Sequence, residues 1–393
     1  MREVVITSAV RTAIGKFGGS LAGTDANELG AIVIRAAVER SGIQKEIVDE
    51  VIMGMVLPCG RGQNPARQAA VRAKMPWEVG CLTVNKVCGS GLKSIMLAAQ
   101  AIGTGDADVI VAGGMESMSQ APYYLDKARF GYRMGPGTFE DHMVHDGLWD
   151  IVNDFHMGIS NELVVEREHV SREDQDKYAL LSQQRAMAAI REGRFRDEIV
   201  PVEVPGKKGE VKRFDVDEHP RDTTLEALSK LPSVFKKGGN TTAGNASGIA
   251  DGASAVVIMA RDKATKLGCP VMATVRSQAH SGLDMKYILF APTLAIPKVL
   301  KKEGLEIRDI DLFEINEAFA GSTLAVIRDL DLDIGKVNVN GGSIALGHPI
   351  GASGARVLTT LLYEMGRRDS RIGLATLCLG GGEAVALIVR RDL

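Results

Sequence analysis

The chain has 393 residues, of which 47 are basic and 49 acidic, and its net charge is −2. This balance argues against a nucleic-acid-binding surface, which normally needs a basic face. No apolar run approaches the roughly 20 residues that span a bilayer, so we expect no membrane segment. The five cysteines are widely spaced and form no CxxC pair. This pattern argues against a disulfide framework or a metal site and fits a reduced, cytoplasmic setting.

Strand-like and helix-like segments alternate along the chain. The first ten residues alternate like a strand and lack the apolar stretch of a signal peptide. Buried-strand runs follow at 109–114, 256–260 and 312–315, and a glycine-rich turn before the first of them leads into an amphipathic helix. Residues 171–193 predict a polar helix with Ser171 as its N-cap. This alternation predicts an α/β fold.

Two segments repeat at an almost constant offset, which indicates an internal duplication. Residues 87–106 align without a gap on 350–369, an offset of 263, and residues 36–55 align on 298–317, an offset of 262. In both copies a buried-strand run and a glycine cluster follow the first of these segments. We therefore expect two homologous halves, each with a mostly parallel sheet and covering helices.

Residues 121–249 interrupt the repeat and differ from it in composition. They carry most of the histidines and a polar helix. An insert on a duplicated core commonly supplies ligand contacts. The predicted domains are an N-terminal half, a loop domain and a C-terminal half, at residues 1–120 with 250–269, 121–249 and 270–393.

Cys88 precedes the predicted amphipathic helix in the segment NKVCGSGLK. A thiol at a helix N-terminus feels the positive end of the helix dipole, so we expect its pKa to fall. Gly89 and Gly91 remove side-chain bulk around the thiol. The alternative is an inert buried cysteine, but the flanking glycines favour a nucleophile.

Three other polar side chains are expected near the same place. His348 lies three residues before Gly351, which aligns with Cys88 in the repeat. If a pseudo-dyad relates the halves, the Cys88 and His348 loops face each other. Cys378 and Asn316 each lie at the end of a predicted strand, the edge at which α/β sheets place ligands. The Asn316 amide could hold a water or donate to an oxyanion there.

The glycine-rich runs do not follow a nucleotide-binding pattern. GxGxxG is absent in its dinucleotide-binding spacing, and no P-loop GxxxxGK[ST] occurs. Gly380, Gly381 and Gly382 could instead offer close-packed backbone donors or form a flexible turn. We therefore expect no bound NAD or ATP.

Five motifs together resemble the thiolase family, and within it the biosynthetic acetyl-CoA acetyltransferases. They are NKVCGSG (85–91), GGMESMS (113–119), NEAFA (316–320), NVNGGSIALGHPIGASGAR (338–356) and CLGGG (378–382). The resemblance covers essentially the whole chain and implies two βαβαβαββ halves in five layers, α-β-α-β-α, with an inserted loop domain. It also implies condensation of two acetyl-CoA to acetoacetyl-CoA and CoA, no permanently bound cofactor, and a homotetramer, a dimer of dimers, joined by an arm like residues 126–133.

The same motifs imply roles for single residues. Cys88 resembles the acyl-accepting nucleophile and His348 the base that activates it. Cys378 resembles the acid/base that takes a proton from the second acetyl group. Asn316 resembles the holder of an oxyanion-hole water, beside which His348 donates to the enolate. The backbone amides of Cys88 and Gly380 would form a second oxyanion hole for the acyl-cysteine.

The resemblance assigns the coenzyme A contacts mainly to the insert. His156 and Met157, in FHMG (155–158), would lie near the pantetheine and the acyl thioester, and Arg221 near the adenine nucleotide. The other expected contacts come from AGNASG (243–248) and NEAFA and are Ala243, Ser247, Ala318 and Phe319. Without the resemblance, the insert residues read as ordinary surface loop.

One stretch departs from the family. Related sequences usually carry Met-Gly-x-Gly-Pro beside the acyl pocket, whereas this chain reads Ile-Leu-Phe-Ala-Pro at 288–292. Leu and Ala stand there in place of the two glycines, and these larger side chains affect the length of acyl chain that the pocket accepts. From the match to FHMG we expect a pocket for acetyl groups rather than long chains.

Other functions share some of these features. A degradative 3-ketoacyl-CoA thiolase would use the same catalytic residues on longer substrates. Decarboxylating and HMG-forming condensing enzymes put His or Glu where Cys378 stands, which disfavours them. A Cys/His/Asn set also fits a cysteine hydrolase, and a non-catalytic acyl-CoA-binding protein could keep the same fold. The intact cysteine pair argues against both.

Overall fold

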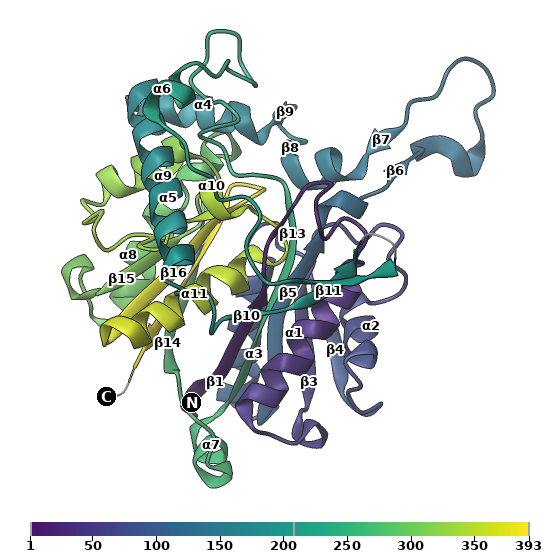
Figure 1. The fold of residues 1–393 in the computed structure, drawn as a ribbon, viewed down its shortest axis with the longest axis vertical. Helices are drawn as coiled ribbons and strands as arrows, with labels where there is room; N and C mark the ends of the chain where they lie inside the picture. The colour runs from purple at the N-terminus through teal and green to yellow at the C-terminus, as the bar shows by residue number, and fades with distance from the viewer. Residues whose placement is uncertain (1, 207–208, 392–393) are drawn as a thin grey trace.

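The computed structural model describes residues 2–206 and 209–391, and Figure 1 shows helices packed around a long sheet. The strands of this sheet are β1 (Val4–Thr12), β2 (Gly15–Lys16), β3 (Glu50–Gly54), β4 (Gly80–Val84), β5 (Val109–Ser117), β10 (Ile199–Val200), β13 (Ala250–Ala260), β14 (Ala273–Gly282), β15 (Leu312–Ile315), β16 (Ile372–Leu379) and β17 (Glu383–Arg390). The α-helices are α1 (Ala26–Ser41), α2 (Pro65–Arg72), α3 (Ser90–Thr104), α4 (Met157–Arg167), α5 (Arg172–Arg191), α6 (Leu225–Ser229), α7 (Arg261–Leu267), α8 (Pro292–Glu303), α9 (Ala320–Asp329), α10 (Ser343–Leu346) and α11 (Ser353–Arg368).

Several local predictions match the observed elements. The strand predicted at 312–315 is β15, and the strand predicted at 256–260 is the end of β13. The predicted polar helix is α5, whose N-cap Ser171 accepts a hydrogen bond from the Asp174 amide at 3.1 Å. All five cysteines are free. Within the described residues, every helix is too short or too polar to cross a bilayer.

The sheet corrects the expectation of two mostly parallel sheets. Its strand order is β15-β16-β17-β14-β1-β13-β5-β3-β4, and the halves join where β1 pairs with β14. The β3–β4, β3–β5 and β15–β16 pairs are parallel, whereas the pairs from β5 through β13, β1, β14 and β17 to β16 are antiparallel. Part of the reason is the turn at 380–382, because three residues can connect β16 to β17 only as a hairpin.

The duplication inferred from the sequence recurs in the hydrogen bonds. Asp49 Oδ2 accepts from the amides of Asp108 and Val109, at 2.7 and 2.9 Å. Asp311 Oδ2 accepts from the amides of Arg371 and Ile372, at 2.8 and 2.9 Å. The two aspartates are 262 residues apart and their partners 263 apart, as in the sequence repeat. Each carboxylate lies just before one strand, β3 or β15, and binds the start of its parallel neighbour, β5 or β16.

Helices α3 and α11 form the middle layer, with sheet on both sides. Helices α1 and α2 cover the outer face of the first half, and α8 packs on the outer face of the second. The two central helices touch at their N-termini through glycines that align in the repeat. A Cβ on Gly91 would lie 2.8 Å from the Ala355 amide nitrogen, and one on Gly354 would lie 2.2 Å from that of Leu92. The helix-start loops thus face each other, as the predicted pseudo-dyad requires.

The insert contains α4, α5, α6 and the short pairs β6 (Tyr123–Tyr124) with β7 (Glu140–Asp141), β8 (Trp149–Asp150) with β9 (Phe155–His156), and β11 (Val202–Pro205) with β12 (Val211–Phe214). It covers the upper end of the layered core with α4, α6, β8 and β9, and it continues across the middle of the molecule to β10 and β11 (Figure 1). A fully buried ion cluster ties it to β1, since Arg11 binds Glu198 at 2.6 Å and Asp217 at 2.7 Å. The β6–β7 arm projects away from the body of the molecule.

Candidate active site

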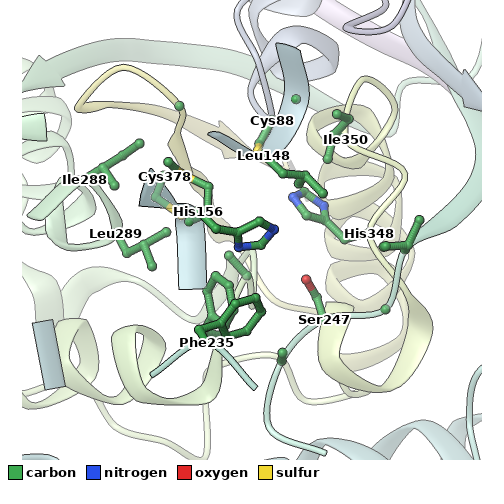
Figure 2. A pocket seen from close by; sticks show the side chains of 18 of the residues that line it. Cys88, Leu148, His156, Phe235, Ser247, Ile288, Leu289, His348, Ile350 and Cys378 are labelled. Atoms are coloured by element: carbon green, nitrogen blue, oxygen red, sulfur yellow. The ribbon is translucent and has the colours of Figure 1, made fainter. Parts of the chain in front are cut away.

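A cavity of about 340 Å³ opens where loops of both halves meet the insert (Figure 2). Most side chains in its wall are apolar, which suits a ligand with a long uncharged arm. Ten of the predicted site residues contribute to the wall: Cys88, His156, Met157, Ala243, Ser247, Ala318, Phe319, His348, Cys378 and Gly380. Asn316 and Arg221 lie outside the wall.

Cys88 is carried on a tight turn just before α3. The preceding Val87 has a φ of 46°, an unfavourable backbone conformation for a β-branched residue. Local bonds hold it there, because Val87 N donates to Asn85 Oδ1 at 3.0 Å and Ser90 Oγ donates to the Val87 carbonyl at 2.6 Å. Ser90 Oγ also accepts from the Lys86 amide at 2.8 Å. The turn therefore aims the thiol into the cavity from a fixed backbone.

The electrostatic environment of Cys88 differs from the sequence-based expectation. Burial raises the pKa of the thiol to about 11, and hydrogen bonds from the amides of Gly380 and Cys88 offset only part of that rise. The predicted fall in pKa is therefore wrong for this resting geometry, because desolvation outweighs the helix N-terminus. The thiol is protonated at neutral pH and needs a base before it can attack a carbonyl.

The same two amides, those of Gly380 and Cys88, are brought together at the Cys88 sulfur. Gly380 belongs to the β16–β17 turn, where a Cβ would lie 2.8 Å from Val87 Cγ1. A Cβ at this position therefore requires the Val87 side chain or one of the two turns to move. Paired amides beside a nucleophile are the usual construction of an oxyanion hole.

Cys378 lies on β16, opposite Ala384 of β17, and is buried. The sequence predicted Cys378 at the end of a strand, and β16 continues one residue further, to Leu379, before it turns. Burial raises the pKa of Cys378 well above its ordinary value, and the neighbouring Cys88 raises it further. Figure 2 shows both cysteines and His348 directed toward the same part of the cavity.

His348 has a defined tautomer. Its Nδ1 lies 2.6 Å from Ser353 Oγ, and that hydroxyl donates to the Pro349 carbonyl at 2.9 Å. A hydroxyl has one proton, so Ser353 must accept from Nδ1–H. Nε2 is then unprotonated and available as a base. Burial, reinforced by the charge of Arg356, lowers the pKa of His348 to about 3, so the imidazole is neutral.

Asn316 follows β15 and is buried behind His348. Its Nδ2 lies 3.5 Å from His348 Nε2, and its Oδ1 accepts from Ser343 Oγ at 2.6 Å. The adjacent Glu317 points the other way, where it accepts from Tyr178 and Ser182 of α5 at 3.0 and 2.7 Å. The NEAFA turn therefore links the imidazole to the insert.

The insert forms the opposite wall of the cavity. His156 caps α4 and stacks on Phe235, with ring centroids 4.7 Å apart. The Ser247 amide donates to the Ala318 carbonyl at 3.0 Å, which joins AGNASG to NEAFA. Arg221 is exposed; its backbone amide donates to Gln183 at 3.0 Å, and its side chain is not part of the wall.

Sequence reasoning missed three residues of the site. Phe235 had no signal, since it lies in an irregular part of the insert. Ser353 aligns with Ser90 in the repeat, and both hydroxyls fasten the turn before a central helix. Glu116, inside GGMESMS, is fully buried, and burial raises its pKa to about 7. It accepts from the Gly351 amide at 2.9 Å and so connects β5 to the His348 loop.

A thiol, a neutral imidazole and paired amides in an apolar cavity are the groups that a cysteine-dependent acyl-transfer site requires. The comparisons agree with this class. The family described as thiolase, N-terminal domain, matches residues 4–262, and thiolase, C-terminal domain, matches residues 269–391. The chain belongs to the thiolase family, and the fold class and enzyme class expected from the sequence are confirmed.

Relatives of known name match over their whole length. An acetyl-CoA acetyltransferase of Pseudomonas aeruginosa is 56% identical over 393 residues, which is 100% of both chains. The solved acetyl-CoA acetyltransferase of Syntrophomonas wolfei is 41% identical, with a TM-score of 0.98 and coverage of 100% of both chains. That of Bacillus anthracis is 43% identical, with a TM-score of 0.97 and coverage of 99% of both.

Proposed function

We propose that the protein is an acetyl-CoA C-acetyltransferase, which joins two acetyl-CoA into acetoacetyl-CoA and free CoA through an acetyl-Cys88 intermediate. The observation that carries the proposal is the convergence of Cys88, His348 and Cys378 on one apolar cavity. The names of relatives that match over the full length support the acetyl substrate.

In the first half-reaction, Cys88 takes the acetyl group. His348 Nε2 accepts the thiol proton, the sulfur attacks the thioester carbonyl, and the amides of Cys88 and Gly380 stabilise the resulting oxyanion. The carbon–sulfur bond to CoA then breaks, and Cys378 protonates the CoA sulfur. The products are CoA, acetyl-Cys88, an imidazolium at His348 and a thiolate at Cys378.

In the second half-reaction, Cys378 acts as the base. Its thiolate removes a proton from the methyl group of a second acetyl-CoA, and the enolate oxygen receives hydrogen bonds from the His348 side and, through a water, from Asn316. The enolate carbon attacks acetyl-Cys88, a carbon–carbon bond forms and the bond to Cys88 sulfur breaks. His348 returns its proton to Cys88, so all three groups are restored.

The elevated thiol pKa values suit this cycle. A protonated resting Cys378 has a proton to give to the departing CoA, and its thiolate is a strong base for a carbon acid because its conjugate acid is weak. A neutral His348 can accept the Cys88 proton. Burial keeps water away from the thioester intermediate, which would otherwise hydrolyse.

The residues that line the acyl pocket favour a short acyl group. Ile288 and Leu289, of the 3₁₀ helix η6 (Met285–Phe290), contribute side chains to the cavity wall beside Cys378 (Figure 2). Phe290 turns elsewhere and stacks under Arg167, with the guanidinium carbon 4.6 Å from the ring centroid. Bulky residues in the wall leave less room for acyl chains longer than acetyl.

The proposal extends to coenzyme A and to assembly. His156, Met157, Ala243, Ser247, Ala318 and Phe319 would contact the pantetheine chain of coenzyme A, and Arg221, outside the wall, would contact the adenine nucleotide.

The projecting β6–β7 arm exposes Phe130, Met134 and Phe139 at 92, 93 and 71%, which supports a homotetramer built through this arm. Light scattering of the purified protein would give its mass in solution.

The test is a chain-length series. Purified protein is given acetyl-CoA alone to follow acetoacetyl-CoA formation, and then CoA with 3-ketoacyl-CoA of increasing length. We expect the highest kcat/KM for acetoacetyl-CoA. Faster cleavage of long chains would instead indicate a degradative thiolase, and absence of both activities would contradict the proposal.

A further inference from the structure

Buried polar side chains continue from Asn316 away from the cavity. Ser343 Oγ lies 2.6 Å from Asn316 Oδ1, and a terminal nitrogen of Arg356 lies 3.2 Å from Ser343 Oγ. All three residues are at most 3% exposed. Neither Ser343 nor Arg356 lines the cavity, so neither has a direct role in the proposed chemistry.

The donors and acceptors in this chain allow one direction. Arginine can only donate, so Ser343 Oγ accepts from Arg356 and gives its own proton to Asn316 Oδ1. The NH₂ group of Asn316 therefore faces His348. A flipped amide would turn a second donor toward Ser343 and leave the Ser343 proton without an acceptor.

The direction continues beyond Asn316. Its Nδ2 faces the unprotonated Nε2 of His348 at 3.5 Å, and His348 Nδ1–H donates to Ser353. The Ser353 hydroxyl donates in turn to the Pro349 carbonyl, which can only accept. One chain of hydrogen bonds thus runs through His348. It begins at the Arg356 guanidinium, which can only donate, and ends at the Pro349 carbonyl, which can only accept.

Arg356 is held in place for this contact. It lies one turn along α11 from Ser353, and its NH1 is 3.6 Å from Glu314 Oε2, on β15 two residues before Asn316. Neither of these two facing atoms has a hydrogen-bond partner in the described residues. One terminal nitrogen of Arg356 therefore lies against Glu314, and the other donates to Ser343.

We propose that Ser343, anchored by Arg356, is a positioning residue that fixes the edge of the Asn316 amide presented to the enolate oxygen. This inference rests on the proposed function, because it assigns Ser343 to the condensation step. Acetylation of Cys88 uses other donors, the amides of Cys88 and Gly380. Measuring the two half-reactions separately therefore shows whether Ser343 acts through Asn316 or has only a general structural role.

The experiment measures both half-reactions in Ser343→Ala. Acetyl transfer is followed as the single-turnover release of CoA, and condensation as acetoacetyl-CoA formation when pre-acetylated enzyme is mixed with acetyl-CoA. We expect acetylation within about twofold of the unmutated enzyme and condensation slowed about tenfold or more, the size of one lost buried hydrogen bond. Ser343→Thr, which retains the hydroxyl, should recover most of the condensation rate.

The matched control is Ser277→Ala on β14. Ser277 is also buried, and its hydroxyl donates to the Val299 carbonyl at 3.2 Å, on α8. Both half-reactions should stay near their unmutated rates in this variant. If Ser343→Ala does not fold, Ser343→Cys takes its place, because cysteine is similar in size and forms weaker hydrogen bonds. We again expect slower condensation with acetylation nearly unchanged.

A double-mutant cycle gives the decisive comparison. In an Asn316→Ala background, Ser343→Ala should slow condensation by less than about twofold, because the residue through which it acts is gone. An equal loss in both backgrounds, an equal loss in both half-reactions, or condensation unchanged in Ser343→Ala would each overturn the inference. Failure of the unmutated protein to form acetoacetyl-CoA would overturn the proposed function instead, so the two failures are distinct.

Discussion

The Nδ1 atom of His348 lies 2.6 Å from the hydroxyl oxygen of Ser353, at the point where the second half of the repeat begins its central helix. Ser90 stands at the equivalent point of the first half and fastens the turn that carries Cys88. Equivalent serines thus support the turn of Cys88 in one half and the imidazole of His348 in the other. The two halves therefore have similar turns at this point, but one carries the thiol of Cys88 and the other the imidazole of His348.

Replacing Ser353 with Ala should slow both half-reactions, because His348 serves both. The Nδ1–H would lose its acceptor in a buried place, which costs about 1–3 kcal/mol and corresponds to about tenfold or more in rate. Single-turnover acetylation and condensation would be measured as for Ser343→Ala, with a thermal melt as the folding control. Acetylation at the unmutated rate would contradict the tautomer assigned to His348.

The reactivity of Cys88 should rise steeply with pH. Burial places the pKa of this thiol near 11, so its thiolate fraction grows about tenfold per pH unit between pH 7 and 9. The pKa of His348 is lowered to about 3, so no second inflection should occur near pH 6.5. Iodoacetamide alkylation, read by mass spectrometry of the Cys88 peptide, tests this, with a small free thiol as reference. A plateau below about pH 8.5 would show that the thiol is activated rather than suppressed.

A methyl group at Gly380 should abolish acetylation. The added Cβ would lie 2.8 Å from Val87 Cγ1, so Val87, in the turn carrying Cys88, or the amide of residue 380 must move. Loss of one oxyanion donor typically costs about 100-fold or more in rate. Gly366→Ala is the control, since it lies within α11 with no atom near the added Cβ. Equal activities in the two variants would remove the Gly380 amide from the mechanism.

The fold could be predicted from the sequence where its signals are local or repeated. The 263-residue offset indicated a pseudo-dyad, and Gly91 and Gly354 do meet across it. The mixed sheet could not be predicted, because strand direction beyond a hairpin depends on which partner lies beside β1. The pairing of β1 with β14 is a contact between residues 4–6 and 273–275, for which no short-range pattern exists.

The site could be predicted as a set of reactive residues, but not as a network. Cys88, His348 and Cys378 carry reactive groups within distinctive motifs. Ser343 and Arg356 also lie in one of those motifs, at residues 338–356, but nothing in the sequence of that motif gives either of them a role. Their importance comes from burial and from the direction of hydrogen bonds, which arise only after folding. The expected fall in the pKa of Cys88 failed for the same reason, since desolvation is a property of the packed cavity.

Leu289→Ala should widen the acyl-chain preference. Leu289 is 5% exposed and lies in the cavity wall, so truncation creates space beside the acyl group. A difference of one methylene is worth about 1–3 kcal/mol in such pockets, or about 10- to 200-fold in relative kcat/KM. Thiolysis of acetoacetyl-CoA and of a six-carbon 3-ketoacyl-CoA gives the ratio. The half-exposed Leu294, on α8, is replaced by Ala as the control, and a ratio that shifts equally in both variants would refute this role for Leu289.

The buried cluster around Arg11 should dominate the attachment of the insert. Asp217→Ala would leave the Arg11 guanidinium, which is 0% exposed, with Glu198 alone. Breaking a buried pair in this way costs about 3–5 kcal/mol of unfolding free energy. Asp215→Ala, which removes a surface pair with Arg213, should cost less than about 1 kcal/mol. Urea unfolding of the two variants compares them, and similar midpoints would show that the cluster is not essential.

The proposed chemistry depends on a covalent acetyl-Cys88 intermediate, which an intact-mass measurement after incubation with acetyl-CoA can detect. We expect one acetyl group per chain, located on the Cys88 peptide, lost when free CoA is added and absent in Cys88→Ala. A protein that turns over acetyl-CoA while Cys88 stays unmodified at saturating substrate, or that carries the acetyl group on another residue, would contradict it.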